Sequence, residues 1–342
     1  MEEIGNQRIL YNNTHQLALL RFAATPKKTV LAGADMAQGC VYVFDSLFGN
    51  QGCYKFPAIF KGIEDYQIIN SDSAIFYSQN QFVIADKNGN VLFERHLNDT
   101  LNPQDSCFMY HYGSLGNYFP PYYDAAADLL YLSRYRIDVD WWFKEWYSAP
   151  VEVVYHFRGN YFSQVPVYYP GSFSKSYLGD LNSVERTISG KENCYAFLGS
   201  PEIVFYNRET HRTKRVMLSK EGLDFNVQPY EGDPLDIQPK MDHLKYNPWF
   251  LGYYRHPNRT FAIRMLEDGV KEKIGDAYSD FDDKVMVLQL YENDNTLIHT
   301  LRLKKKPAGT IAFFSGDTFK IFNGITYANN KTVVDYSCFL LR

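Results

Sequence analysis

The chain has 342 residues and a formal net charge of −4. Its 45% hydrophobic and 22% charged residues describe a folded chain and exclude an intrinsically disordered one. No basic surplus is present to attract nucleic acid, and no run of 18 apolar residues could form a transmembrane helix. Aromatic residues make up 17% of the chain, and they favour the pleated, half-buried surfaces of β-sheets.

A hairpin pattern recurs from the N-terminal third of the chain onward. An alternating apolar strand at 41–45 leads through a glycine-containing turn to a second strand at 53–56. The strand at 82–86 leads in the same way through Asn88-Gly89 to 91–95, and Asn-Gly is a strong hairpin signal. The two copies begin 41 residues apart, which matches the roughly 40 to 50 residues of one propeller blade.

The same pattern continues towards the C-terminus. Hairpins are predicted at 203–216 and 285–301, and a strand, a polar turn and a strand at 122–132 and 253–264. Further alternating runs precede the hairpins, such as 65–69 and 74–77 before the second copy. Each repeating unit is therefore expected to contain four strands.

These units predict an all-β fold, a β-propeller of six blades with four antiparallel strands each, with seven blades as the alternative. The expected blades cover 29–62, 63–100, 105–160, 162–220, 245–303 and 309 to the end. The last unit lacks a strand, which the N-terminal runs at 8–11 and 17–20 are expected to supply. Strands from both termini would then close the ring. We expect one domain over 1–342, with inserted loops near 134–150 and 223–245.

The segment 134–147 contains three of the four tryptophans, Trp141, Trp142 and Trp146. Two interpretations stay open: exposed tryptophans would form a recognition surface, and buried ones would pin an inserted loop to the propeller. The predicted ligand-binding set also includes aromatic residues beside a Pro-Pro turn. Two arginines that could bind an acidic group complete it. The set is Trp141, Trp142, Trp146, Arg134, Arg136, Tyr118, Phe119 and Tyr122.

No catalytic or metal-binding motif stands out. The acidic run at 276–283 does not have the spacing of an EF-hand, and a solvated turn is favoured over a calcium site. The eight histidines are dispersed, and neither a nucleophile elbow nor a phosphate-binding loop is found. We therefore predict no catalytic residue, no metal and no cofactor.

The five cysteines are scattered along the chain. They lack the close paired spacings of metal sites and redox motifs, and most are expected to be buried. Cys40 and Cys53 flank one predicted hairpin and could face each other across it. The spacing leaves open whether these two are bonded.

The phrase at 66–97, which includes Q-I-I-N-S-D-S-A-I-F-Y-S and F-V-I-A-D-K-N-G-N-V-L, resembles an uncharacterised propeller family of Bacteroidetes bacteria. So do 253–264 and 285–290. Members look like six-bladed, TolB-like propellers, and many are exported lipoproteins of unknown function. The resemblance supplies no catalytic residue and implies a periplasmic or outer-membrane location. The start, Met1-Glu2-Glu3, has no export signal as given. Either a leader was removed or the protein is cytoplasmic, and the resemblance favours removal.

The expected function is that of a monomeric, non-catalytic binding or scaffold propeller. It would recognise a peptide, a glycan or a protein partner through its loops and central funnel. One alternative is a propeller-type hydrolase or lyase acting on glycans, and another is a structural component of a cell-envelope complex. Paired carboxylates in a channel pocket would favour the enzyme.

Overall fold

The fold is taken from a computed structural model, which describes most of the chain. The described residues are 1–11, 17–24, 29–44, 50–60, 62–78, 81–96, 108–111, 119–136, 138–218, 227–270, 273–274, 277–278, 280–303, 307, 311–328 and 331–341.

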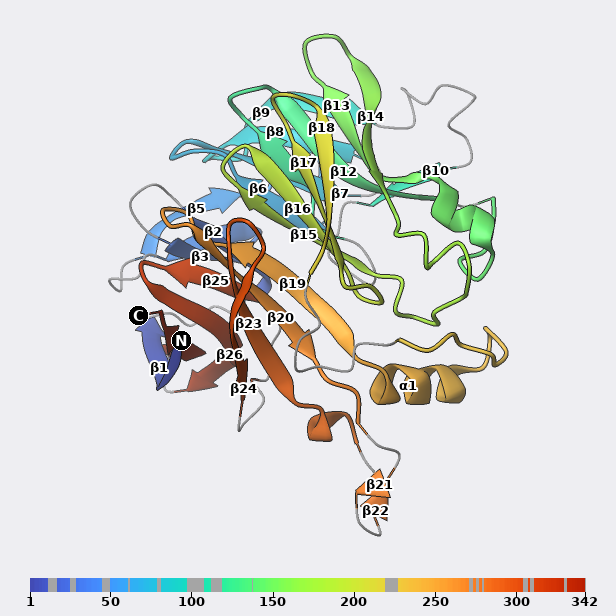
Figure 1. Ribbon diagram of the computed structural model, residues 1–342. Helices are drawn as coiled ribbons and strands as arrows, with labels where there is room; N and C mark the ends of the chain where they lie inside the picture. Colours follow the sequence, from blue (N-terminus) through green and yellow to red (C-terminus); the bar gives the residue numbers. More distant parts are fainter. Residues whose placement is uncertain are drawn as a thin grey trace.

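Six antiparallel sheets follow one another around a ring (Figure 1), so the predicted six-bladed β-propeller is confirmed. The first blade contains β2 (Ala18–Ala24), β3 (Thr29–Asp35), β4 (Cys40–Phe44) and β5 (Asn50–Lys55). The second contains β6 (Asp65–Ile68), β7 (Ser73–Ser78), β8 (Gln81–Asp86) and β9 (Val91–His96). The third contains β10 (Phe108–His111) and β11 (Tyr122–Asp124), both paired with β12 (Leu129–Arg136), then β13 (Pro150–His156) and β14 (Tyr161–Tyr168).

The remaining blades have the same order of pairing. The fourth contains β15 (Val184–Ser189), β16 (Glu192–Phe197), β17 (Glu202–Asn207) and β18 (Arg212–Met217). The fifth contains β19 (Trp249–Arg255), β20 (Phe261–Glu267), β23 (Met286–Glu292) and β24 (Leu297–Arg302). The sixth contains β25 (Ala312–Ser315), β26 (Thr318–Ala328), β27 (Lys331–Leu340) and β1 (Glu2–Tyr11).

The N-terminal strand closes the ring, as predicted. β1 pairs antiparallel with β27, from Glu2 opposite Leu340 to Tyr11 opposite Thr332, and the two termini lie side by side (Figure 1). The second N-terminal run, 17–20, was assigned to the wrong blade. It leads into β2, which pairs with β3 in the first blade.

Two blade boundaries also differ from the prediction. The first blade begins at β2 and not at residue 29. Because β14 pairs with β13 in the third blade, the fourth blade begins at Val184 and not at residue 162. Alternation of apolar residues marks a strand, but the pairing partner is fixed by contacts beyond the strand itself. The predicted hairpins themselves are confirmed, as β4–β5, β8–β9, β17–β18 and β23–β24.

The turn between β8 and β9 shows why its sequence is Asn-Gly. Gly89 has a φ of +86°, and a Cβ atom there would lie 2.8 Å from the carbonyl oxygen of Phe56. The Asp86 carboxylate accepts hydrogen bonds from the backbone N–H groups of Asn88 and Asn90, at 2.8 and 2.9 Å. A glycine is therefore required by both conformation and space.

Cys40 and Cys53 form a disulfide that joins β4 to β5. The sequence left this pairing open. Cys194 and Cys338 are free and buried, and Cys107 lies outside the described residues.

The long connections gather on one face of the ring. Successive strands of a blade run in opposite directions, so the link from second to third strand and the link to the next blade leave at the same end. The loop residues 138–149 include the 3₁₀ helix η3 (Lys144–Ser148), and α1 (Ile237–Tyr246) precedes β19. With the loop 169–183, these elements lie on the same side of the ring (Figure 1), here called the loop face.

The loop between β20 and β23 carries the short pair β21 (Lys273–Ile274) and β22 (Ala277–Tyr278) and the 3₁₀ helix η4 (Phe281–Asp283). In the ranges given above, no helix is long and apolar enough to cross a membrane.

Candidate functional site

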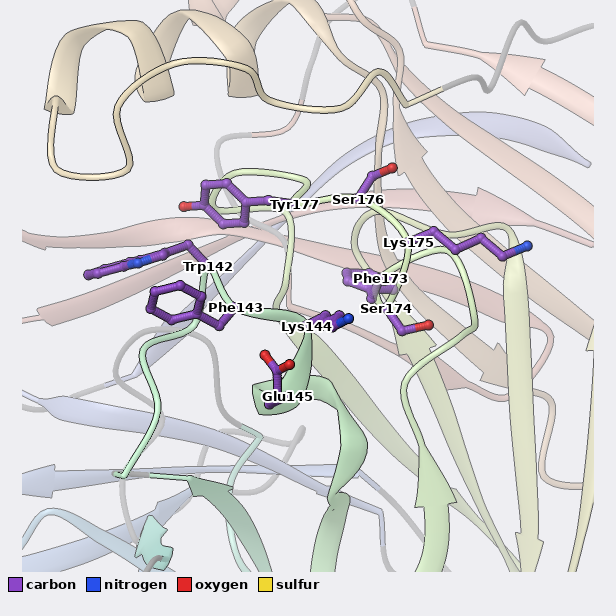
Figure 2. Close-up of a pocket in the computed structure, with 9 residues that line it drawn as sticks. All are labelled: Trp142, Phe143, Lys144, Glu145, Phe173, Ser174, Lys175, Ser176 and Tyr177. Atoms are coloured by element: carbon purple, nitrogen blue, oxygen red, sulfur yellow. The ribbon is translucent and has the colours of Figure 1, made fainter.

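A pocket of about 320 Å³ opens on the loop face between a loop within the third blade and the loop that leads from the third blade to the fourth. Residues 142–145, from the loop between β12 and β13, form one wall, and residues 173–177, from the loop between β14 and β15, form the other. Figure 2 shows the rings of Trp142, Phe143 and Tyr177 gathered at one end.

Two buried aromatic residues fix the first wall. Trp146 and Tyr147 belong to η3 and point into the core, where they are only 5% and 4% exposed. The indole N–H of Trp146 donates to the Arg136 carbonyl at 3.2 Å, and the Tyr147 hydroxyl donates to the Trp141 carbonyl at 2.7 Å. Since buried Trp and Tyr carry one polar handle each, these two bonds also satisfy groups that would be costly to bury unpaired.

With those anchors in place, the neighbouring rings are held out towards solvent. Trp141 is 37% exposed and Phe143 is 50% exposed, and Trp142 is half-buried between them. Trp142 packs edge-on against Trp141, with ring centroids 4.9 Å apart. The aromatic end of the pocket is therefore rigid and accessible at the same time.

A hydrogen bond connects the two walls. The Trp141 indole N–H donates to the Tyr177 hydroxyl oxygen at 3.3 Å. Burial raises the pKa of Tyr177 to about 12, so the hydroxyl stays protonated at neutral pH. The Tyr177 oxygen accepts a hydrogen bond from the indole N–H, so the Tyr177 O–H group can still donate a hydrogen bond to a ligand.

Phe173 anchors the second wall. Its side chain is 1% exposed and packs against Tyr147 and Tyr169, at centroid distances of 5.5 and 5.3 Å. The chain then turns through a hydrogen bond from the Lys175 N–H to the Ser172 carbonyl at 3.2 Å. This arrangement leaves Ser174 and Lys175 exposed.

Three charged side chains line the pocket: Lys144, Glu145 and Lys175. All three are exposed, and none forms a side-chain ion pair with any described residue. Figure 2 shows the Lys144 ammonium and the Glu145 carboxylate near the pocket, and the Lys175 side chain at its outer end. The pocket thus combines aromatic rings with hydroxyls and with charges of both signs.

Comparisons with solved structures support the fold. A member of the DUF4221 family from Bacteroides vulgatus is similar to this chain with a TM-score of 0.74 at 12% identity, over 99% of each chain. The propeller shares its fold with Bacteroides proteins. A "Putative exported protein" from Bacteroides fragilis gives a TM-score of 0.50 at 13% identity, over 100% of this chain and 97% of the other.

The resemblance drawn from the blade sequences is therefore confirmed at the level of fold. No protein-family model matches the propeller, and no curated protein matches its sequence.

The tryptophan segment contributes to the pocket in three ways. Trp142 lines it, Trp141 borders it through the bond to Tyr177, and Trp146 is buried below. Arg136 supports the same wall. Its guanidinium pairs with Asp138, with 2.8 Å from Nε to Oδ1, and donates to the Glu145 carbonyl at 3.1 Å.

The other predicted residues lie away from the pocket. Arg134 is 6% exposed on β12. Phe119 and Tyr122 lie at the joint between the third and fourth blades, where the Arg186 guanidinium is 4.7 and 5.8 Å from their ring centroids. Tyr118 lies outside the described residues. Arg134, Phe119 and Tyr122 do not line the pocket, and the role of all four residues in binding stays a prediction.

Sequence reasoning missed the second wall completely. The stretch 170–177, P-G-S-F-S-K-S-Y, is rich in Gly, Pro and Ser and leads to the next blade. Such a loop is a frequent carrier of function, and this signal could have marked it. Nothing in the letters, however, places it opposite Trp142.

α1 supports the second wall from behind. Lys240 pairs with Asp180 at 3.7 Å, and its ammonium lies 5.9 Å from the centroid of the Trp141 ring. At the other end of the helix, the buried Lys284 ammonium donates to the carbonyls of Leu244, Lys245 and Asn247 at 2.7–3.2 Å. A cation at this end satisfies carbonyls that have no partner within the helix.

The acidic run near η4 has a structural role in the part that is described. Asp280 accepts a hydrogen bond from the Phe281 N–H at 2.6 Å, and the Asp283 carboxylate accepts one from the Asp280 N–H at 2.7 Å. Together they form a capping box. Asp276 lies outside the described residues, and no group of three or more metal-ligating side chains occurs among those searched.

Proposed function

We propose that this propeller is a binding protein that holds a saccharide in the pocket between 142–145 and 173–177. The observation that carries the proposal is the rigid, partly exposed pair Trp142 and Phe143, fixed from below by buried Trp146 and Tyr147. A sugar ring presents an apolar face that stacks on an aromatic ring, and hydroxyls at its edge that need polar partners. The pocket offers both kinds of contact.

Rigidity supports binding at this place. Ordering a loop when a ligand arrives costs free energy, and a wall that is already ordered avoids this cost. The bond between Trp141 and Tyr177 ties the two walls together before any ligand is present. The volume of about 320 Å³ is at the small end of the roughly 300–1,000 Å³ usual for ligand sites, so a short stretch of a glycan fits.

Hydrolysis is the alternative that the pocket supports less well. Glycosidases generally need two carboxyl groups, one on each side of the bond that is cleaved. Glu145 is the one carboxylate among the described lining residues. We therefore place binding ahead of catalysis.

We also infer an extracytoplasmic location. The Cys40–Cys53 disulfide belongs to an oxidising compartment, and the name of the Bacteroides fragilis neighbour points the same way. Alkylation of free thiols in native cells, followed by mass spectrometry, tests this: modified Cys40 and Cys53 would contradict it.

The binding proposal is tested with a panel of glycans and peptides and with two variants. Trp142→Ala with Phe143→Ala removes the aromatic end, and Tyr161→Ala removes a ring that is 52% exposed on β14 of the same blade. We expect the double variant to bind glycans at least about tenfold more weakly, a change of roughly 1.4 kcal/mol, and the control to bind normally. Circular dichroism checks that both are folded.

Two results would contradict the proposal. One is glycan binding that the double variant leaves unchanged, and the other is a peptide ligand preferred over every glycan in the panel.

A further inference from the structure

We infer that the saccharide is acidic, with a sugar carboxylate that Lys144 and Lys175 bind from opposite walls of the pocket. The inference rests on the proposed function and adds the chemical class of the ligand.

The two lysines differ from the other cations of the loop face. Lys240 forms an ion pair with Asp180, and Lys245 forms one with Asp242 at 3.1 Å. The Lys284 ammonium donates hydrogen bonds to three backbone carbonyls. Lys144 and Lys175 are exposed, and neither has an ion-pair partner among the residues that the structure describes. Their charges are thus free to meet an anion from outside.

The two lysines also lie close in sequence to the aromatic residues on which a sugar ring would stack. Lys144 directly follows Phe143 and opens η3, and Lys175 lies two residues before Tyr177. In Figure 2 the Lys144 ammonium lies near Glu145, and the Lys175 side chain extends away from the Trp142 ring towards the outer end of the pocket. A sugar ring stacked at Trp142 could therefore reach these cations with a carboxylate on its far side.

Glu145 then favours a ligand that carries hydrogen-bond donors beside its carboxylate. An ionised carboxylate can only accept hydrogen bonds, so it needs donors from the ligand. A sugar supplies several hydroxyls around its ring, whereas an acidic side chain supplies none and a peptide has only its backbone N–H groups. The lining residues Lys144, Lys175 and Glu145 together carry a charge of +1 in a chain of net charge −4, so the pocket favours an anion that also brings hydroxyls.

The test compares matched trisaccharides that differ only in charge. Uronic acid trisaccharides of the galacto, gluco and manno series are titrated beside their neutral hexose counterparts by calorimetry. We expect at least one uronate to bind more tightly than its neutral partner, with an affinity that falls as salt is added. Lys144→Met and Lys175→Met should each lower the uronate affinity about threefold to fivefold, and each should lower the affinity for the neutral partner by a smaller factor.

Lys214→Met is the matched control, because Lys214 is an exposed lysine on β18 of the neighbouring blade. It should bind uronates like the wild type. Penta-glutamate, an anion without sugar hydroxyls, should bind more weakly than the preferred uronate.

Three outcomes would overturn the inference. The first is that no uronate, in any of the three series, binds more tightly than its neutral partner. The second is that the Lys144 and Lys175 variants bind uronates like Lys214→Met, and the third is that penta-glutamate binds as tightly as the preferred uronate. Neutral binding that still depends on Trp142 would leave the proposed function standing. If the wild type bound no saccharide at all, both the inference and the proposed function would be overturned.

Discussion

At the scale of single residues, the joint between the third and fourth blades is built on a buried ion pair. Glu152 on β13 is fully buried, and the Arg186 side chain on β15 is 2% exposed. Arg186 donates to the Glu152 carboxylate and to the Pro120 carbonyl, and the Tyr195 hydroxyl donates to Glu152. Burial raises the pKa of Glu152, and the guanidinium acts in the opposite direction. Each charge therefore depends on its partner.

Removing one partner should be far more costly than removing both. Arg186→Met leaves a buried carboxylate without its cation and should lower the free energy of unfolding by about 3–5 kcal/mol. Adding Glu152→Met to that variant should restore much of the loss. Lys191→Met breaks the exposed pair with Glu209 and should cost less than about 1 kcal/mol. Urea denaturation measures all three, and equal losses in the single and double variants would contradict the account.

The same residues show what sequence reasoning cannot reach. Glu152 and Arg186 are 34 positions apart on different blades, and no local pattern connects them. Phe119 and Tyr122 were predicted as ligand contacts because they flank a Pro-Pro turn. In the folded chain they border the Arg186 guanidinium, a contact that exists only once the two blades have docked.

At the scale of elements, hairpins were predictable and strand partners were not. A two-residue turn such as Asn88-Gly89 fixes the pairing of its own two strands locally. The run at 17–20 leads into β2, which pairs with the next strand, β3, and the residues between them, 25–28, contain no Asn-Gly signal that would mark this pairing. The tryptophan loop was recognisable from its composition, but its opposite wall at 173–177 depends on how two blades stack.

α1 should detach more easily in acid because of His243. The Nε2–H of His243 donates to the Gln228 carbonyl at 2.8 Å, and Nδ1 is buried and makes no hydrogen bond with any described residue. Burial lowers the pKa of His243, although the Gln228 carbonyl and Asp180 oppose this effect. The unfolded chain therefore binds the proton more readily than the folded one. The stability that neutral His243 provides is present above its ordinary pKa of about 6.5 and is lost as the pH falls below it.

His243→Gln keeps a donor for the Gln228 carbonyl but cannot titrate. The free energy of unfolding of the wild type should fall more steeply than that of the variant between neutral pH and mildly acid pH. The difference in slope is at most about 1.4 kcal/mol per pH unit for one proton. His96→Gln, at a side chain that is 53% exposed, should follow the wild type. Parallel curves for the wild type and His243→Gln would contradict the assignment.

At the scale of the whole molecule, the ring is a rigid support for loops on one face. β1 and β27 pair along their length, so the last blade is completed by the opposite end of the chain and the edge of β27 is covered. The composition and the repeat predicted this architecture, because four short strands per unit cannot bury their faces without neighbours. The proposed binding pocket lies between two loops that this packing brings together.

The most direct test of the account is hydrogen exchange measured with and without a saturating uronic acid trisaccharide. If the pocket is the binding site, exchange should slow at 140–147 and 172–178 on the loop face. It should stay unchanged at the turns 87–90 and 208–211, which connect third to fourth strands and so lie at the other end of the blades. Protection at those turns, or binding without protection of either pocket wall, would contradict the central claim.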